Sequence, residues 1–515
     1  MEARRTGGGD LIAGMTTIRG FWKLAARDPQ RPAVVTVADG EVTTFGELAA
    51  TANRLSNGLR GRGLGVGDVL ALVLSNRVEY LALQLAAHQI GLHLLPVNRH
   101  LTTPETAHIL ADSGAALVVV DERTAEVAVA AAAQAGITAV YGIGVVAGLR
   151  DYAALLGEPT PPADRVAGAM LFYSSGTTGR PKGILRQLSG LTPELEQERM
   201  IEAGEALGMT PDGMFLSVGP LYHAAPNQNM FMGLQLGQTV ILAPRFDPAS
   251  ALALIQNYAV TDTFLVPTMM HRLLAAPGRV EFDVSSLRTV LHGGGMCPVA
   301  VKRAMIDWLG PVLMEYYGSS ESRAVTLIGS ADWLRHEGSV GRPKPGLKVR
   351  ICGEDGVERP VGTTGMIQLH TGFTVEYIGD PAKTASSYQD GYFIPGDIGY
   401  LDEDGWLFVC DRRTDLIVSG GVNIYPAEIE GVLLAHPDVH DAAVFGAADP
   451  EWGQSVVALV ELREPVGTEE LARHCRESLA KFKLPRVLEV VAALPRTPMG
   501  KVNRGALREA YESSR

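Results

Sequence analysis

The sequence predicts an α/β fold in which a large N-terminal part is followed by a small α+β domain. Between residues 21 and 121, and again between 240 and 291, short apolar runs alternate with segments of helical periodicity. This pattern is typical of βαβ units and a mostly parallel sheet. Beyond residue 340, glycine and proline become frequent and apolar residues alternate with the two-residue period of antiparallel strands. A polar run at 411–415 then precedes a final segment of about 100 residues, which is long enough for a small domain.

In the first half of the pattern, uninterrupted apolar runs predict buried strands and the longer segments between them predict helices. The predicted strands are 34–37, 69–74 and 116–120, and the predicted helices are 48–59, 79–90 and 125–135. Thr44 and Glu47 have the spacing of a capping box, which places the start of the first helix directly after Thr44.

The alternation resumes in the middle of the chain and changes character near its end. Strands are predicted at 240–243, 263–266 and 289–291, and antiparallel strands at 347–351, 365–369 and 405–409. The final segment has predicted strands at 441–445 and 456–460, and predicted helices at 427–434 and 469–479.

Composition limits the function classes. The chain has 515 residues, 46% hydrophobic and 20% charged, as expected of a soluble globular protein with several core-forming units. A net charge of −12 argues against a nucleic-acid or anionic-membrane partner. Four widely separated cysteines exclude a disulfide scaffold and suit a reducing cytoplasm. No apolar stretch reaches the length of a membrane span or a signal peptide. These features predict a cytoplasmic protein. A monomer or a homodimer is expected.

A glycine-rich stretch at 173–183 follows an apolar strand and predicts a phosphate-binding loop. It combines glycines, which allow tight turns, with hydroxyl and ammonium donors, and it contains no acidic group, so it suits a polyphosphate. The Walker A pattern is absent, because Lys182 is followed by glycine and not by serine or threonine. A flexible surface loop is the alternative interpretation. The candidate nucleotide-binding residues are Ser174, Ser175, Gly176, Thr177, Thr178, Gly179 and Lys182.

Four later stretches stand in a fixed order behind this loop: 315–321, 391–397, 411–425 and 494–502. Together the five motifs resemble those of the adenylate-forming (ANL) superfamily, in its acyl-CoA synthetase or acyl-AMP ligase branch, and the resemblance covers about 21–508. It implies an α/β large N-terminal domain of two βα sheet subdomains plus a small β-rich subdomain. A small mobile α+β C-terminal domain would follow, with the boundary between 1–411 and 412–515.

The resemblance also implies the roles of the nucleotide-binding residues. Glu321 would hold Mg2+, since a carboxylate beside phosphates is a suitable ligand for this ion. Ser320 would contact the α-phosphate, Asp397 the ribose hydroxyls, and Arg412 the ribose or a phosphate. The remaining candidates would surround the adenine, with Tyr317 lying on the base: Glu315, Tyr316, Tyr317, Gly318 and Ser319 from one motif, and Gly293, Gly294 and Gly295 from a glycine triplet.

The C-terminal motifs imply a catalytic lysine, a hinge and a thiol channel. Lys501 matches the family's adenylating lysine, whose ammonium stabilises the charge that develops on the α-phosphate. Arg413 and Thr414 stand at the hinge, where the family has lysine or aspartate at the position of Thr414 and glycine at that of Asp411. The CoA-binding candidates are Ser419, Gly420, Gly421 and Phe482.

The stretch 221–226 follows an apolar strand and resembles the aromatic and histidine motif that lines the family's acyl pocket. The resemblance implies a pocket at Tyr222, His223 and Met296, with His223 also a catalytic candidate near the substrate carboxylate or the thiol channel. A structural histidine is the alternative interpretation. No aspartate occurs between 214 and 246 to pair a substrate ammonium, so an amino-acid substrate is not expected. Small and apolar neighbours suggest an uncharged acyl body, bulky or alicyclic.

The predicted reaction has two steps. ATP with Mg2+ and a carboxylic acid give acyl-AMP and pyrophosphate, and coenzyme A then takes the acyl group as a thioester. Three alternatives remain open: an acyl-AMP ligase that passes its product to a carrier protein or a separate ligase, a luciferase-like oxidase, and a nucleotide- or acyl-binding protein without catalysis. The loop at 173–183 is expected to be mobile without ATP.

Overall fold

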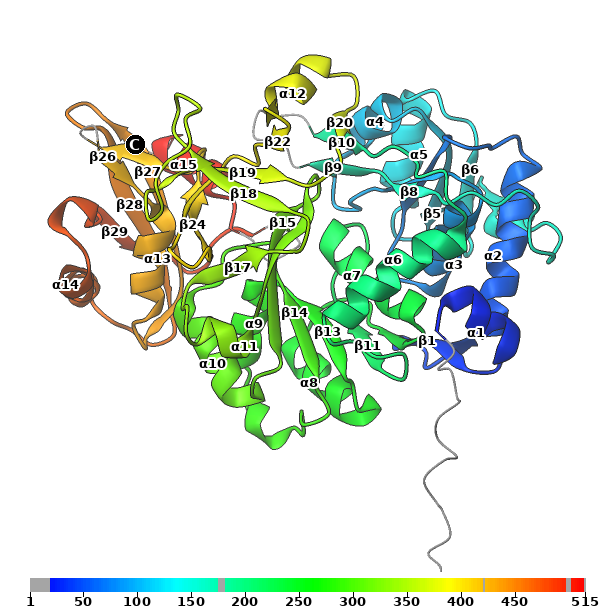
Figure 1. Ribbon diagram of the computed structural model, residues 1–515, viewed down its shortest axis with the longest axis horizontal. Helices are drawn as coiled ribbons and strands as arrows, with labels where there is room; N and C mark the ends of the chain where they lie inside the picture. The colour runs from blue at the N-terminus through cyan, green and yellow to red at the C-terminus, as the bar shows by residue number, and fades with distance from the viewer. Residues whose placement is uncertain (1–18, 175–180, 420–421, 497–501, 514–515) are drawn as a thin grey trace, which may run out of the picture.

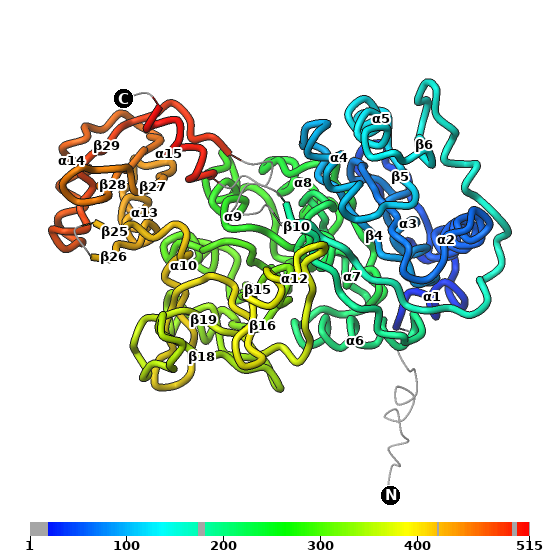
Figure 2. Tube along the Cα trace, turned by 90° about the horizontal axis from the view of Figure 1, so that it is seen from above, coloured from blue at the N-terminus to red at the C-terminus, as the bar shows by residue number. Residues whose placement is uncertain are grey.

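The computed structural model describes residues 19–174, 181–419, 422–496 and 502–513. A large N-terminal portion holds most of the chain, and a smaller portion built from its last hundred or so residues lies at one end (Figures 1 and 2). The fold is mixed α/β, as the sequence predicts.

The first sheet is parallel and comes from the early part of the chain. Helices from the same part of the chain pack against it, and its central strands are almost wholly buried, as in βαβ folds. In spatial order the strands are β7 (Arg150–Asp151), β6 (Val140–Ile143), β5 (Ala115–Asp121), β3 (Val69–Val73), β4 (His93–Pro96) and β8 (Ala169–Met170). The helices are α1 (Phe21–Arg27), α2 (Phe45–Arg60), α3 (Val78–Gln89), α4 (Thr103–Asp112) and α5 (Ala125–Gln134).

The start of α2 confirms the predicted capping box. Thr44 Oγ1 accepts a hydrogen bond from the backbone N–H of Glu47 at 3.2 Å, and Glu47 Oε2 accepts from the backbone N–H of Thr44 at 2.9 Å. Two of the donors that a helix start leaves unpaired are therefore satisfied locally.

The second sheet begins with a parallel half. Its strands are β1 (Pro32–Thr36), β12 (Thr239–Leu242), β11 (Met214–Ser217), β13 (Asp262–Leu265), β14 (Thr289–His292) and β15 (Leu313–Ser319), and β2 (Val42–Thr44) pairs with β1 at the edge. Its helices are α6 (Pro193–Ala206), α7 (Ala224–Leu236), α8 (Pro248–Tyr258), α9 (Pro267–Leu274) and α10 (Val299–Leu309). Val34 pairs with Val240, so β1, together with its sequence neighbour β2, joins strands from the middle of the chain.

This sheet continues into an antiparallel, β-rich part. The predicted strands near 349 and 367 pair as neighbours, with Val349 opposite Leu369. The strands are β16 (Arg323–Gly329), β17 (Ser339–Pro343), β18 (Lys348–Cys352), β19 (Gly365–His370), β21 (Tyr388–Gln389), β22 (Tyr392–Phe393), β23 (Asp397–Leu401) and β24 (Leu407–Arg412), with the short α11 (Ser330–Trp333). A separate small sheet holds β9 (Phe172–Ser174), β10 (Lys182–Leu185) and β20 (Glu376–Tyr377), followed by α12 (Pro381–Ser386).

The C-terminal portion has its own sheet and its own hydrophobic core. Its strands are β25 (Ile417–Ser419), β26 (Val422–Ile424), β27 (Val439–Asp449), β28 (Gly453–Leu462) and β29 (Val487–Val490), and its helices are α13 (Pro426–Leu434), α14 (Thr468–Ser478) and α15 (Arg504–Ser513). Among the described residues, no hydrophobic cluster combines side chains from before 410 with side chains from after 416. The exact boundary at 411/412 stays a prediction.

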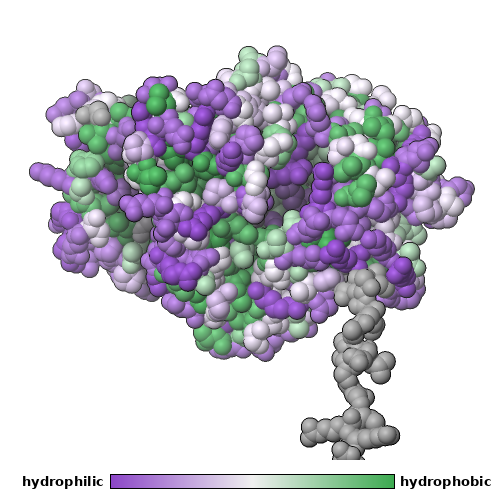
Figure 3. Space-filling model, viewed as in Figure 1, coloured by the Kyte–Doolittle hydropathy of each residue, from purple (hydrophilic) through white to green (hydrophobic). Residues whose placement is uncertain are grey.

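Hydrophilic and hydrophobic residues are interspersed on the face shown in Figure 3. Within the described ranges, no helix is both long enough and apolar enough to cross a bilayer.

Candidate active site

Three motif residues that lie far apart in the sequence meet in one group, which we call the carboxylate cluster: Tyr317, Asp397 and Arg412. Tyr317 Oη donates a hydrogen bond to Asp397 Oδ2 at 2.6 Å, and Arg412 Nε lies 3.4 Å from Asp397 Oδ1. β15, β23 and β24 position them, and Asp397 stands opposite Arg412 in the register of β23 and β24. The Arg412 side chain is 62% exposed, so the cluster opens outward.

Burial dominates the electrostatics of this cluster. Asp397 is 8% exposed, and its burial raises the pKa of the carboxyl group above the ordinary value, opposed by Arg412 and by the hydrogen bond from Tyr317. Burial, together with the neighbouring carboxylate, also raises the pKa of the Tyr317 phenol. A carboxylate that is fixed and partly desolvated in this way can accept hydrogen bonds from a pair of vicinal hydroxyls.

The turn after β15 places Ser320 and Glu321 close to the cluster. The turn is tight, because a Cβ at Gly318 would lie 1.7 Å from the backbone oxygen of Arg323. Ser319 Oγ accepts a hydrogen bond from the backbone N–H of Glu321 at 3.2 Å, which fixes the turn from within.

Two residues that the sequence did not single out hold the same turn from outside. Tyr377 Oη donates to Glu321 Oε1 at 3.0 Å. Arg186 is buried, 8% exposed, and donates to the backbone oxygen of Ser320. Burial, with a smaller contribution from Arg323, lowers the pKa of Arg186 to about 9. Neither belongs to a recognised motif, so only the three-dimensional arrangement identifies them.

The predicted phosphate loop is described only at its two ends. Ser174 closes β9 and Lys182 opens β10, and the two stand opposite each other in the register of the hairpin. Lys182 Nζ lies 2.5 Å from Asp380 Oδ2, and this bond holds the pKa of Asp380 below its ordinary value. The part of the loop that is expected to be mobile lies outside the described residues, with Ser175, Gly176, Thr177, Thr178 and Gly179.

The adenine-binding candidates lie at the ends of two neighbouring parallel strands. Gly293–Gly295 follow β14, and Gly294 has a φ of +75°, which favours glycine. The side chain of Glu315 is directed into the protein, where it pairs with the buried Lys302 of α10. Tyr316 Oη accepts a hydrogen bond from Asn229 Nδ2 at 3.0 Å. With these side chains engaged inside, Glu315 and Tyr316 offer a nucleotide mainly their backbone.

The three predicted acid-binding residues differ in their surroundings. His223 is the N-cap residue of α7, and its ring lies 4.5 Å from the Tyr222 ring, between centroids. Met296 is 46% exposed. The apolar neighbours Met230 and Met232 are buried in the main hydrophobic core, so packing alone accounts for their apolar character.

Tyr222 instead lines a basic cavity of about 220 Å3 between the loops after β4 and β12 and helix α9. Three guanidinium groups surround it, those of Arg99, Arg245 and Arg272, and we call it the arginine cavity. Burial raises the pKa of the Tyr222 phenol to about 12, and its hydroxyl has no hydrogen-bond partner among the described residues.

The arginine cavity has more positive than negative charge. Within the described part of the chain, no ion pair joins its three arginines to a carboxylate. Asp247 caps α8 nearby, and its pKa lies below the ordinary value mainly because Ser250 donates to it, with smaller contributions from Arg245 and Arg272. Such a cavity suits an anion that carries several charges.

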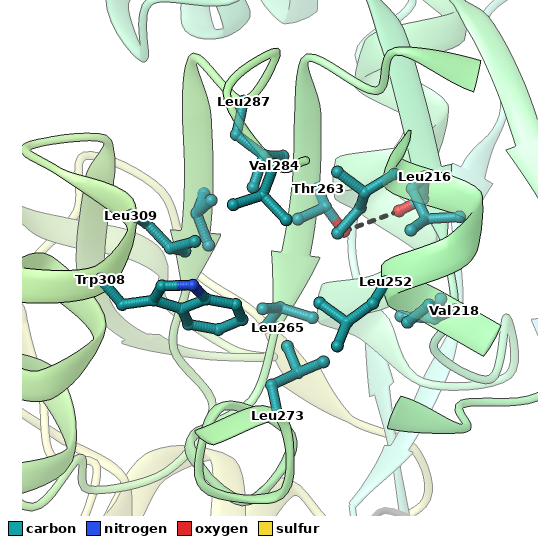
Figure 4. Close-up of a pocket in the computed structure, with 13 residues that line it drawn as sticks. Leu216, Val218, Leu252, Thr263, Leu265, Leu273, Val284, Leu287, Trp308 and Leu309 are labelled. Atoms are coloured by element: carbon teal, nitrogen blue, oxygen red, sulfur yellow. Dashed lines mark hydrogen bonds between the residues drawn. The ribbon is translucent and has the colours of Figure 1, made fainter. Parts of the chain in front are cut away.

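A second cavity, shown in Figure 4, differs from the arginine cavity in both lining and size. It lies among apolar side chains such as Leu265, Leu273 and Trp308, and its volume is about 10 Å3. That volume is at the lower limit for a single water molecule. It is a packing gap inside the main core and cannot hold a substrate.

The remaining candidates belong to the C-terminal part. Ser419 closes β25, and Phe482 is 53% exposed on the surface. Arg413 and Thr414 are exposed between β24 and β25. Lys501, Gly420 and Gly421 lie outside the described residues.

The described residues contain no group of three or more side chains arranged as a metal site. Mg2+ usually keeps several waters and takes one or two protein carboxylates together with substrate phosphates. Glu321, held in place by Tyr377, fits that donor set.

Comparisons with known proteins agree with this arrangement. Residues 21–375 match the family described as AMP-binding enzyme, and residues 428–501 match the AMP-binding enzyme C-terminal domain. The long-chain-fatty-acid–CoA ligase FadD13 of Mycobacterium tuberculosis is 31% identical over 96% of this chain and 98% of its own length. The feruloyl-CoA synthase of an Amycolatopsis species is 35% identical over 92% of this chain and 94% of its own.

A solved relative is available in two states. MatB from Rhodopseudomonas palustris is 32% identical, and the match covers 96% of this chain and 99% of MatB in each state. The TM-score is 0.84 for the ATP-bound structure and 0.73 for the apo structure. Since identity and coverage are the same, the overall shape of this chain is closer to the ATP-bound state.

Fold and relatives together define an enzyme of the adenylate-forming superfamily. The chain belongs to the AMP-binding enzyme family, and within it to the AMP-forming acid–thiol ligases.

Proposed function

We propose that this enzyme uses ATP to convert a carboxylic acid without an ammonium group into an acyl-AMP, and then transfers the acyl group to coenzyme A. The carboxylate cluster is the observation that best supports the proposal. It brings together three motif residues, at positions 317, 397 and 412, next to the turn that holds Ser320 and Glu321.

In the first step, Asp397 accepts hydrogen bonds from the ribose hydroxyls, and Arg412 turns from Asp397 to the ribose or a phosphate. Lys182 leaves Asp380 for the β- and γ-phosphates, with the donors of the loop at 174–179. Ser320 donates to the α-phosphate. Each of these residues contributes positioning and charge, which dominate phosphoryl- and nucleotidyl-transfer catalysis.

Glu321 would hold Mg2+, which, when bound, neutralises part of the phosphate charge. Tyr377 orients this carboxylate through its hydrogen bond at 3.0 Å. His223 lies near the substrate carboxylate or the thiol channel.

Lys501, from the C-terminal domain, supplies the ammonium that stabilises the charge on the α-phosphoryl oxygens as the acid attacks. We expect Lys501→Ala to lose nearly all pyrophosphate release and yet still convert synthetic acyl-AMP and CoA into thioester. An equal loss in both assays would contradict this division of roles.

In the second step the C-terminal domain, taken as 412–515, rotates about Arg413 and Thr414. Ser419, Gly420 and Gly421 would then line the channel for the pantetheine arm, and Phe482 would contact the CoA adenine. The arginine cavity supports CoA as the acceptor, because its three guanidinium groups, none of which is ion-paired with a carboxylate among the described residues, suit the phosphates of that molecule.

The acid has an uncharged acyl body, bulky or alicyclic. Support comes from the absence of any aspartate or glutamate between 214 and 246, and from Ala224 and Ala225, small residues that follow His223 at the start of α7. A cytoplasmic location is part of the proposal, since all four cysteines are free thiols.

A pyrophosphate-release screen tests the proposal. The panel holds octanoic, benzoic, cinnamic, cyclohexanecarboxylic and indole-3-acetic acids with alanine as a control, each with and without CoA. We expect release with at least one of the five acids, none with alanine, and thioester formation only when CoA is present. Release without any thioester would instead favour an acyl-AMP ligase with a carrier protein or separate ligase as acceptor.

A further inference from the structure

We propose that Asp411 is a positioning residue that holds the C-terminal domain in the arrangement used for adenylation. The inference rests on the proposed two-step function. The carboxylate stands one residue before the exposed segment 412–414, on the last strand of the N-terminal portion, and it contacts the first helix of the C-terminal portion.

The contacts of Asp411 join the two portions directly. Its Oδ1 accepts a hydrogen bond from the backbone N–H of Arg412 at 2.8 Å, and its Oδ2 accepts from the backbone N–H of Ala427 at 3.1 Å. Ala427 is the second residue of α13, after Pro426, so its N–H is one of the donors that a helix start leaves unpaired. An anion at this end of a helix is also favoured by the helix dipole.

Asp411 is fixed on its own side. It is 3% exposed, and its backbone pairs with Ile398 of β23. On the other side of the exposed segment, Asp415 is held to the C-terminal portion by Arg504 of α15, with 2.9 Å between Nη1 and Oδ2. Only residues 412–414 lie between the two anchors. A rotation of the C-terminal portion about this segment would therefore separate Asp411 from Ala427.

An independent contact joins the two portions elsewhere. Arg463 Nη2, from the loop after β28, lies 2.9 Å from His271 Nε2 on α9. Burial lowers the pKa of His271 to about 4, so at neutral pH the ring is uncharged and its Nε2 can accept the hydrogen bond. This contact and that of Asp411 are both present in an arrangement whose shape is closer to the ATP-bound state of MatB than to the apo state. A rotation about residues 412–414 would break both of them.

The consequence is a bias between the two steps. Contacts present in only one arrangement stabilise that arrangement relative to the other. Asp411 therefore favours acyl-AMP formation, and its loss should favour the rotated arrangement that transfers the acyl group to CoA.

Two variants test this role: Asp411→Asn, which turns an amide donor toward one of the two backbone N–H groups, and Asp411→Ala, which removes both acceptors. Asp355→Asn, in an exposed turn, is the control. The first readout is trypsin cleavage after Arg412 and Arg413, which needs no substrate. We expect cleavage to be about 5- to 10-fold faster in both variants, from the loss of hydrogen bonds to a charged group.

The second readout is the ratio of the two half-reactions, with the best acid of the panel and its synthetic acyl-AMP. We expect pyrophosphate release to fall about 5- to 10-fold while thioester formation from acyl-AMP is unchanged or faster. Arg463→Met should shift the ratio in the same direction. An unchanged ratio, or an equal fall in both half-reactions with a lower melting temperature, would overturn the inference. A wild-type protein inactive in both assays would instead overturn the proposed function.

Discussion

The carboxylate cluster and the arginine cavity differ in whether their charged groups are paired with groups of opposite charge. In the first, Asp397 already has a phenol at 2.6 Å and a guanidinium nitrogen at 3.4 Å. In the second, three guanidinium groups surround about 220 Å3 with no carboxylate ion-paired to them in the described residues. One site is assembled before its ligand arrives, whereas the other carries more positive than negative charge.

This difference suggests different energetic roles. A preassembled site loses protein contacts when the ligand replaces them, but its geometry is fixed in advance, which favours catalysis. A cavity with excess charge gains affinity from each anionic group that enters, and that affinity falls with added salt. Substitutions in the cluster should therefore affect the adenylation rate, and those in the cavity the affinity for the acceptor.

The largest effect is expected for Asp397→Asn. The amide keeps an acceptor for Tyr317 but loses the negative charge that attracts Arg412 and that, in the proposed function, binds the ribose hydroxyls. Hydrogen bonds to charged groups contribute about 1.5–3 kcal/mol, so kcat/KM for ATP should fall about 10- to 100-fold. Pyrophosphate release at several ATP concentrations measures this. The thioester yield from synthetic acyl-AMP should be much less affected.

The same variant should not be unstable. Burial raises the pKa of Asp397, so the folded protein binds this proton more tightly than the unfolded chain does. The free energy of unfolding therefore falls as pH rises from the ordinary aspartate value of about 4 through the raised pKa. Melting curves of Asp397→Asn should lack this fall. Asp404→Asn, in an exposed turn, is the control, and a strongly lowered melting temperature at pH 7 would show that Asp397 is mainly structural.

A smaller effect is expected for Arg272→Met in the arginine cavity. Loss of one partly exposed cation should raise KM for CoA about 5-fold, with acid-dependent pyrophosphate release unchanged. The increase should shrink at high salt, where the wild-type enzyme also loses attraction for the phosphates.

Arg27→Met, exposed on α1, makes the same charge change far from the cavity and should leave KM unchanged. If Arg272→Met lowered pyrophosphate release and left KM for CoA unaltered, the cavity would serve the acid or ATP and not the acceptor.

The two sites also differ in how far the sequence could predict them. The motifs identified Tyr317, Asp397 and Arg412, because each stands in a stretch that resembles a motif of the adenylate-forming superfamily. Arg245 and Arg272 stand in no pattern, and only the packing of α9 against the loop after β12 brings them together. The same holds for Arg186 and Tyr377, which act on the turn at Ser320 and Glu321 from other elements.

For the fold, too, the sequence predicted local features but not which distant segments come together. Local periodicity predicted most strands and the capping box of α2, since these depend on neighbouring residues. It did not predict that β1 pairs with β12, with Val34 opposite Val240. Nor did it predict that Met230 and Met232 are core residues, because a buried core and an apolar pocket have the same composition.

The smallest effect is expected for Tyr317→Phe, which tests whether Tyr317 sets the pKa of Asp397 in addition to its place in the cluster. The hydrogen bond from Tyr317 lowers the pKa of Asp397 and so opposes the effect of burial. Without it the pKa should rise further, and the acidic limb of the profile of kcat/KM for ATP against pH should move to higher pH. On the plateau of that profile at high pH, the loss should be about 3-fold, at the lower end of the range for one hydrogen bond. Tyr400→Phe, on the same strand as Asp397 but stacked on Phe408, is the control. A uniform loss at all pH values, with the limb unmoved, would mean that Tyr317 does not set the pKa of Asp397 and contributes only through the proposed contact with the base.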